Sequence, residues 1–338
     1  MRRVSRIVLG LMISALAGVL PEQGVLAGPT VDACATRADL LGLSRIIEVD
    51  AAKGPMFGPS PKGAFEVLGD REVILTFDDG PLRRYTMQVL KALSAHCTKA
   101  TFFMVGRMAV ADPAMVKEVA KRGHTIGAHT WSHAKLQTVS LNKARDEIEL
   151  GFSAVAGALG SPIAPFFRFP YLRMSDTAVG YLKSRSVASF HIDIDSRDFD
   201  TRNASIVKRR VLAQLSKRGK GILLFHDIQP STAQALKGIL DELKARGFKV
   251  VHMVPKANAQ TLADYDTMAS REMKRRKLAT AKQPLAKRSV VWPVMGGASN
   301  DGKREVLPWE KKRRPSARTK RTRAKQASNS WYSWFGSW

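Results

Sequence analysis

Short apolar runs rich in β-branched and aromatic residues alternate with longer amphipathic segments between residues 73 and 254. The short runs predict strands and the longer segments predict helices. Strands joined through helices are parallel, because the helix returns the chain to the edge at which the previous strand began. Seven strands are predicted: VILTF (73–77), ATFFMV (100–105), TIGAH (125–129), PFFRF (165–169), VASFHIDI (187–194), GILLFH (221–226) and FKVVHMV (248–254). The pattern therefore predicts an α/β fold, either an open doubly wound sheet or a (β/α) barrel.

Ionisable side chains follow five of the seven predicted strands. They are Asp78 and Asp79, then His129 and His133, then Arg168, then Asp193, Asp195 and Asp198, and finally His226 and Asp227. The carboxyl ends of parallel strands meet at one edge of a sheet, where α/β proteins bind their ligands. This convergence predicts an active site at that edge. Single residues also fit structural roles, as Asp195 fits a brace within its loop.

His129 and His133 have the i, i+4 spacing found in many zinc sites. This spacing is a weak signal alone, since ordinary histidine pairs share it. An oxygen ligand from Asp79 would complete three protein ligands and leave a position open, which is typical of a catalytic site. Asp78 and Asp79 also fit a polar turn after a strand, but two adjacent carboxylates repel unless both are used.

Five segments occur in the order and approximate spacing of known family motifs: TFDDG (76–80), HTWSH (129–133), RFPY (168–171), DSRDF (195–199) and LFH (224–226). Over about residues 70–255 the chain resembles the NodB-type polysaccharide deacetylases, carbohydrate esterase family 4. The resemblance implies a distorted (β/α) barrel of about seven strands. We assign residues 70–258 to this domain.

The resemblance implies a metal-dependent hydrolase that removes N-acetyl groups from amino-sugar polymers such as peptidoglycan, chitin-like oligomers or exopolysaccharide. A metal-bound water would attack the acetamide carbonyl. Asp79, His129 and His133 would hold the divalent metal, usually zinc, with cobalt or another divalent ion as alternatives. These three ligands follow from the family's first and second motifs.

The same resemblance implies the roles of the other motif residues. Asp78 would be the general base, and His226 the general acid that protonates the departing amine. Arg168 would pair with Asp78, and Asp198 would orient Arg168 or His226. The backbone N–H of Tyr171 would stabilise the oxyanion.

One motif residue departs from the family pattern. The fourth motif usually ends in Trp, and this chain has Phe199 there. Phe keeps an apolar wall beside the substrate but lacks the indole N–H. The shape of the groove, and with it the substrate, is therefore left open.

The first 69 residues predict an export signal and an arm. Arg2, Arg3 and Arg6 precede an apolar stretch (7–20), and VLA (25–27) suits signal peptidase, so residues 1–27 predict a signal peptide. An uncleaved anchor is the alternative. Residues 28–69, rich in Gly and Pro between 51 and 65, predict an extended arm. The protein is then exported, either periplasmic or secreted.

The two cysteines, Cys34 and Cys97, lie far from the histidine motif. In an exported chain they predict one disulfide between the N-terminal extension and the domain. The alternative is two free buried thiols.

Residues 259–338 predict a basic, Trp-rich, disordered tail. Residues 271–338 contain 19 Lys and Arg against 4 Asp and Glu. Their net charge of 19 − 4 = +15 is more than half of the net charge of +26 of the whole chain. Residues 270–288 fit a basic amphipathic helix, and residues 310–326 have almost no apolar side chains. Such a tail suits an anionic envelope surface or membrane, or has no binding role. Nucleic acid is not expected, because an exported protein rarely meets it.

Two other functions use the same residues. A non-catalytic glycan-binding envelope protein would keep the fold, but it has no need of a base such as Asp78. A glycosidase would use the two carboxylates, although here they accompany two metal-type histidines. Release of acetate, of new reducing ends, or of neither separates the three functions.

Overall fold

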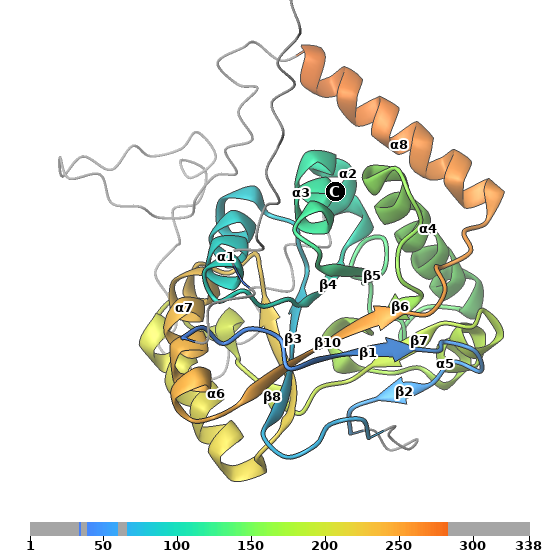
Figure 1. Ribbon diagram of the computed structural model, residues 1–338. Coiled ribbons are helices and arrows are strands. Elements are labelled where there is room, and N and C mark those ends of the chain that lie inside the picture. The colour runs from blue at the N-terminus through green and yellow to red at the C-terminus, as the bar shows by residue number, and fades with distance from the viewer. Residues whose placement is uncertain (1–33, 35–38, 60–65, 283–338) are drawn as a thin grey trace, which may run out of the picture. The chain divides into compact units, whose positions relative to one another are not determined.

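The computed structural model describes Cys34 and residues 39–59 and 66–282. The chain divides into two compact units, Met1–Arg37 and Ala38–Trp338. All described helices and strands lie in the second unit (Figure 1). The predicted signal peptide, residues 283–338 of the predicted tail, and residues 28–33, 35–38 and 60–65 of the predicted arm lie outside the described residues.

A parallel sheet organises the second unit. Its strands are β1 (Arg45–Val49), β2 (Met56–Phe57), β3 (Glu72–Asp78), β4 (Thr101–Met104), β5 (Thr125–Ala128), β6 (Phe166–Phe167), β7 (Ala188–Phe190), β8 (Ile194–Asp195), β9 (Gly221–His226) and β10 (Lys249–Pro255). The order is β1-β10-β3-β4-β5-β6-β7-β2, with β9 between β3 and β8. Each strand pair among the described residues is parallel. The predicted parallel α/β fold is confirmed, while closure into a barrel stays a prediction, because no described pairing joins β2 to β8.

Strand β3 lies at the centre of this arrangement. It pairs with β9 from Val73 opposite Gly221 to Asp78 opposite His226. Its other edge pairs with β10 at its start and with β4 at its end. The register therefore brings the carboxyl ends of β3 and β9, and the side chains of Asp78 and His226, to the same level.

Alternation along β3 separates the apolar core from the polar site. Val73, Leu75 and Phe77 belong to the larger core cluster together with residues of the surrounding helices, and the Phe77 ring stacks on those of Phe102 and Phe225. Ile74 belongs to a second cluster on the opposite face, the face that Thr76 and Asp78 share by the period of two. The strand thus buries one polar pair among apolar neighbours.

Helices connect the strands and cover the sheet (Figure 1). They are α1 (Arg83–Ala95), α2 (Gly106–Ala111), α3 (Pro113–Lys121), α4 (Leu141–Leu159), α5 (Asp176–Ser184), α6 (Ala204–Arg218), α7 (Pro230–Ala245) and α8 (Ala263–Lys282), with short 3₁₀ turns η1 (Pro170–Leu172) and η2 (Asp198–Asp200). The side chains of Asp112, Ser140 and Asn203 cap the N-termini of α3, α4 and α6. Helices α1, α3 and α7 lie in longer amphipathic segments between predicted strands, as the alternation predicts.

The prediction of one continuous strand at 187–194 is wrong, because this segment forms two strands, β7 and β8. The Asp193 carboxylate accepts a hydrogen bond from the backbone N–H of Ile222 (2.9 Å) and pairs with Arg218. The chain therefore leaves β6 and β2, the partners of β7, and pairs β8 with β9. Tertiary pairing decided this break.

The segment 28–69 contains two strands that its composition does not predict. Strand β1 pairs with β10, and β2 pairs with β7. Gly54 and Gly58 have positive φ at the turns around β2, so the glycines that suggest an irregular arm instead serve turns beside short strands. Both Cys34 and Cys97 are disulfide-bonded, which excludes two free thiols.

Within the predicted tail, residues 263–282 form α8, which overlaps the basic helix expected at 270–288 and begins seven residues before it. Ala269 is buried, and Tyr265 and Met273 pack with it against α2 and α4, where Val110, Leu150 and Ala154 complete a third apolar cluster. Residues 283–338 lie outside the described residues. In the described ranges, none of the helices has the length and apolar character needed to cross a membrane.

Candidate active site

The carboxyl end of β3 places two carboxylates in different directions. Asp78 is the last residue of the strand, and Asp79 has a φ of 75°. Gly80 follows, and a Cβ there would lie 2.2 Å from the carboxylate oxygens of Asp227. Only glycine therefore fits this turn, and the change of direction at Asp79 separates the two carboxylates.

Asp79, His129 and His133 form the cluster that the sequence predicts as metal ligands. Their nearest ligand atoms all lie within 4.8 Å of one another. The Nε2 atoms of His133 and His129 lie 3.3 and 3.5 Å from Asp79 Oδ1. All three side chains are buried. The cluster forms because β3 and β5 end at the same edge of the sheet.

The donor set fits a divalent cation. His129 Nδ1 lies 2.7 Å from the carbonyl oxygen of Arg168; a carbonyl accepts, so Nδ1 carries the proton and Nε2 faces Asp79 with a free lone pair. Asp79 Oδ1 is buried and has no hydrogen-bond partner among the described residues. An unpaired buried carboxylate oxygen is costly, and a cation at this point would satisfy it.

The electrostatics of the cluster favour the metal-binding protonation states. Burial lowers the pKa of His129 to about 3 and also lowers that of His133. Burial alone would raise the pKa of Asp79, but the neighbouring histidines lower it overall. The result is two neutral imidazoles and one carboxylate, which are the forms that bind metal.

Arg168 holds Asp78 inside the sheet. This guanidinium is fully buried and donates to Asp78 Oδ1 (2.8 Å) and Thr76 Oγ1 (2.6 Å). It also donates to the backbone carbonyls of Phe190 and His191. Burial raises the pKa of Asp78 to about 6, although Arg168 and His226 oppose the rise. Asp78 is therefore a fixed carboxylate that can accept a proton near neutral pH.

His226 and Asp198 form a second pair, in which Asp198 is buried and His226 is partly buried. His226 Nδ1 donates to Asp198 Oδ1 at 2.6 Å. The other oxygen of Asp198 accepts from the His226 backbone N–H (2.7 Å) and from the hydroxyl of Thr232. Burial would lower the pKa of His226, but Asp198, Asp79 and Asp78 raise it to about 10. His226 is then a charged imidazole whose Nε2 lies 3.9 Å from Asp79 Oδ2.

Aromatic rings lie beside two histidines of the candidate site, His133 and His226. Tyr171 has a φ of 61° within η1, and its ring packs edge-on against His133 with centroids 4.6 Å apart. The ring of Phe199 stands perpendicular to that of His226, at 5.8 Å. Both predicted substrate-contacting residues thus lie beside the cluster. The oxyanion role of the Tyr171 N–H stays a prediction.

Unusual backbone conformations concentrate around this site. Ten non-glycine residues in the described ranges have positive φ, and six of them are Asp79, Thr130, His133, Tyr171, Leu172 and Arg197. Such conformations cost free energy and persist where surrounding structure imposes them, as at functional sites. Asp195 braces this region by accepting from the N–H of Arg197 (2.9 Å).

The structure adds site residues that were given no role from the sequence. Thr76 contacts Arg168, and its place at the start of TFDDG was the available signal. Thr232 contacts Asp198 and is an ordinary helix residue, so no sequence signal identifies it. Asp227 accepts from Thr86 Oγ1 (2.6 Å), and burial raises its pKa to about 7. Its place directly after His226 was the available signal.

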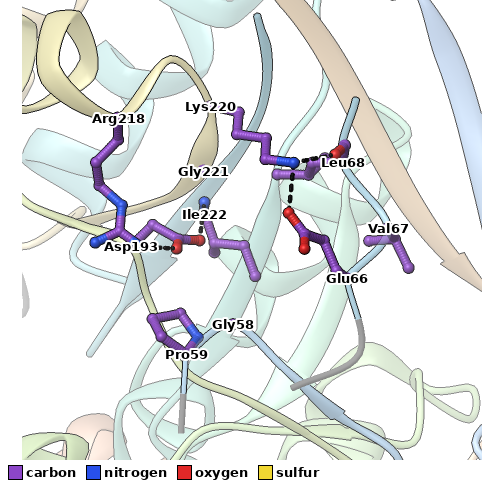
Figure 2. Close-up of a pocket in the computed structure, with 10 residues that line it drawn as sticks. All are labelled: Gly58, Pro59, Glu66, Val67, Leu68, Asp193, Arg218, Lys220, Gly221 and Ile222. Atoms are coloured by element: carbon purple, nitrogen blue, oxygen red, sulfur yellow. Dashed lines mark hydrogen bonds and ion pairs between the residues drawn. The ribbon is translucent and has the colours of Figure 1, made fainter. Parts of the chain in front are cut away.

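A cavity of about 210 Å³ lies away from these residues, at the amino ends of β8 and β9 (Figure 2). Its charged side chains face one another: Lys220 pairs with Glu66 and Arg218 with Asp193, as the dashed lines in Figure 2 show. None of the predicted catalytic or metal-binding residues lines it. We therefore place the candidate active site at the carboxyl edge of the sheet.

Comparison with known proteins finds similar sequences and structures. Residues 66–188 match the family model described as "Polysaccharide deacetylase". A peptidoglycan-N-acetylglucosamine deacetylase of Listeria monocytogenes is 32% identical over 182 residues, covering 54% of this chain and 38% of that protein. A chitooligosaccharide deacetylase of a Bradyrhizobium strain is 28% identical over 204 residues, covering 56% of this chain and 92% of that protein.

Among solved structures, a peptidoglycan deacetylase from Bdellovibrio bacteriovorus is similar with a TM-score of 0.59 and 34% identity, covering 65% of this chain and 61% of that one. The matched part of the chain spans 38% of the length of the Listeria relative, which is well under two thirds. The matched region contains Asp78, Asp79, His129, His133 and Arg168. Through this region, the chain is similar to the polysaccharide deacetylases.

Proposed function

We propose that the protein is an exported, metal-dependent N-deacetylase that hydrolyses the acetamide groups of amino-sugar polymers. One observation carries the proposal: a buried carboxylate on Arg168, an imidazole on Asp198 and a buried Asp-His-His cluster lie together at one edge of the sheet. An amide needs both an activated nucleophile and a protonated leaving group, and these groups can supply both.

Asp79, His129 and His133 would hold the cation. A divalent metal there would act as a Lewis acid that polarises the carbonyl oxygen and makes water a better nucleophile. Zinc suits a set of two imidazoles and one carboxylate, and cobalt is the next candidate. The neutral imidazoles and the ionised Asp79 are already in the protonation states that such binding needs.

Asp78 and His226 would move the protons. Asp78 accepts a proton from the attacking water as its oxygen bonds to the acetamide carbon. The backbone N–H of Tyr171 donates to the oxyanion that forms. When the carbon–nitrogen bond breaks, His226 donates a proton to the amine, and acetate leaves. Arg168 and Asp198 keep the base and the acid in place.

The substrate is an N-acetylated glycan, with peptidoglycan, chitin-like oligomers and exopolysaccharide as the classes to compare. The relatives named above are described as acting on peptidoglycan N-acetylglucosamine and on chitooligosaccharide. Phe199 beside His226 and Tyr171 beside His133 would form the apolar walls against the sugar rings.

The decisive experiment measures acetate released from peptidoglycan and from N-acetylglucosamine oligomers by zinc-loaded protein. We expect release from at least one glycan, its loss on chelation and its return with zinc. New reducing ends without acetate would point to a glycosidase. Unchanged glycan binding by metal-free protein, with no acetate from any glycan after zinc is restored, would favour a binding protein.

A further inference from the structure

The loop between the two predicted histidine ligands has an unusual backbone. It consists of Thr130, Trp131 and Ser132, and both Thr130 (φ 64°) and His133 (φ 62°) are in the left-handed region. Non-glycine residues adopt this conformation at a cost, and the surrounding structure must hold them there. The contacts of this loop therefore decide where the His133 imidazole lies.

Helix α2 contacts one side of the loop through backbone donors. The N–H groups of Gly106 and Arg107 donate to the carbonyl oxygens of Thr130 (2.9 Å) and Trp131 (3.0 Å). These N–H groups belong to the first turn of the helix and have no partner within it. The carbonyl groups of Thr130 and Trp131 are thereby satisfied.

On the other side, one residue of helix α4, Glu147, accepts the hydrogen bonds of the loop. Its backbone carbonyl accepts from the N–H of Trp131 (2.7 Å). Its carboxylate accepts from both the N–H and the hydroxyl of Ser132, each at 2.8 Å. Glu147 is 3% exposed. Three donors of the loop thus converge on one buried residue.

The approach of α4 to the loop is also close sterically. A Cβ at Gly151 would lie 2.7 Å from the backbone carbonyl carbon of Thr130. Thr130 Oγ1 in turn accepts from the N–H of His133 at 2.9 Å. Helix α4 therefore contacts the two residues that lie next to His133 in this loop: Glu147 binds Ser132, and Gly151 lies against Thr130.

We propose that Glu147 is a positioning residue that fixes the metal ligand His133 and so sets the affinity of the Asp79-His129-His133 cluster for a divalent cation. Groups that hold metal ligands in place typically contribute about 10- to 100-fold to metal affinity. The proposal rests on the proposed function only in taking these three residues as the metal site.

Glu149 provides a matched control on the same helix. It is 2% exposed, and its carboxylate binds the Tyr181 hydroxyl and the Arg185 guanidinium at 2.7 and 2.8 Å. These partners connect α4 to the α5 region and contact none of the three ligands. Replacing Glu149 removes a buried carboxylate from α4 without changing the loop.

The experiment measures the zinc dissociation constant of folded, metal-stripped protein by competition with a chromogenic chelator. We expect Glu147→Ala to weaken zinc binding about 10- to 100-fold. Glu147→Gln should stay within about threefold of wild type, because its amide can accept from the Ser132 N–H and donate to the Ser132 hydroxyl. Glu149→Ala should stay within about twofold, although thermal unfolding of the metal-free protein shifts to lower temperature.

Equal zinc affinity of Glu147→Ala and wild type, or an equal loss in Glu149→Ala, would overturn the proposal. If Glu147→Ala does not fold, Ser132→Ala decides, because it removes one of the three bonds; we expect weaker zinc binding, and unchanged binding refutes the inference. Wild type that binds zinc but releases no acetate refutes the proposed function alone. Wild type that binds no zinc refutes both.

Discussion

The two edges of the sheet both gather charged residues, but they satisfy them differently. At the amino edge, Lys220 donates to the Leu68 carbonyl (2.9 Å) and pairs with Glu66, while Arg218 pairs with Asp193. At the carboxyl edge, Asp79 Oδ1 is buried without a hydrogen-bond donor in the described part of the chain. A cavity with paired charges is stable as it is, whereas an unpaired buried acceptor beside two imidazoles calls for a cation.

Backbone conformation differs between the edges in the same sense. Six non-glycine residues with positive φ surround the carboxyl edge. The cavity at the amino edge is lined by residues of which only the glycines Gly58 and Gly221 have positive φ, a conformation that glycine adopts without strain. The volume of a cavity is therefore a poorer indicator of the site here than strain and unsatisfied polar groups.

The largest expected effect is that of Asp79→Ala at the carboxyl edge. It removes the carboxylate that faces both imidazoles, so we expect loss of bound zinc and of acetate release together. Zinc content after gel filtration and acetate release would be measured on the same sample. Full zinc content in this variant would show that the cluster is not the metal site.

Asp78→Asn should separate catalysis from metal binding. The amide keeps a hydrogen-bond acceptor for Arg168 but cannot accept a proton from water, so we expect acetate release to fall about 10²- to 10⁴-fold. Zinc content should stay at the wild-type level. Full activity of this variant would contradict the role of Asp78 as the base.

His124, which precedes β5 at the amino edge, should make stability depend on pH. Burial lowers its pKa to about 3, and its Nδ1 accepts from the Ala100 N–H. As pH falls below about 6.5, His124 is protonated in the unfolded chain but not in the folded one. Its protonation therefore lowers the free energy of unfolding by about 2 kcal/mol at pH 5. His124→Asn should lose less of its free energy of unfolding between pH 8 and pH 5. Identical losses in urea denaturation would contradict the assignment.

The smallest effect is expected for Arg218→Ala in the cavity of Figure 2. Its side chain is 48% exposed in the ion pair with Asp193, and such pairs contribute about 0 to 1 kcal/mol. We expect acetate release to be unchanged and the free energy of unfolding to decrease by about 0 to 1 kcal/mol. A large loss of acetate release with normal zinc content would mean that the amino edge contributes to function.

The sequence pattern was sufficient to predict those strands and site residues whose residue types have a single physical explanation. The alternation of apolar runs predicts β3, β4, β5, β9 and β10, because a strand buried on both faces is apolar throughout. The ligand-type residues Asp79, His129 and His133 were found for a similar reason, since carboxylates and imidazoles following parallel strands must meet at one edge.

The sequence by itself determined the α/β class, the edge that carries the site and the residues that meet there. Tertiary structure decided the break after β7, the packing of α8 on α4, and the contacts of Thr76 and Glu147 with the site. These contacts join residues distant in the chain through side chains that are common in any strand or helix. Only the folded chain shows that Asp78 and Asp79 diverge, because the left-handed conformation at Asp79 turns one carboxylate toward the histidines and leaves the other on Arg168.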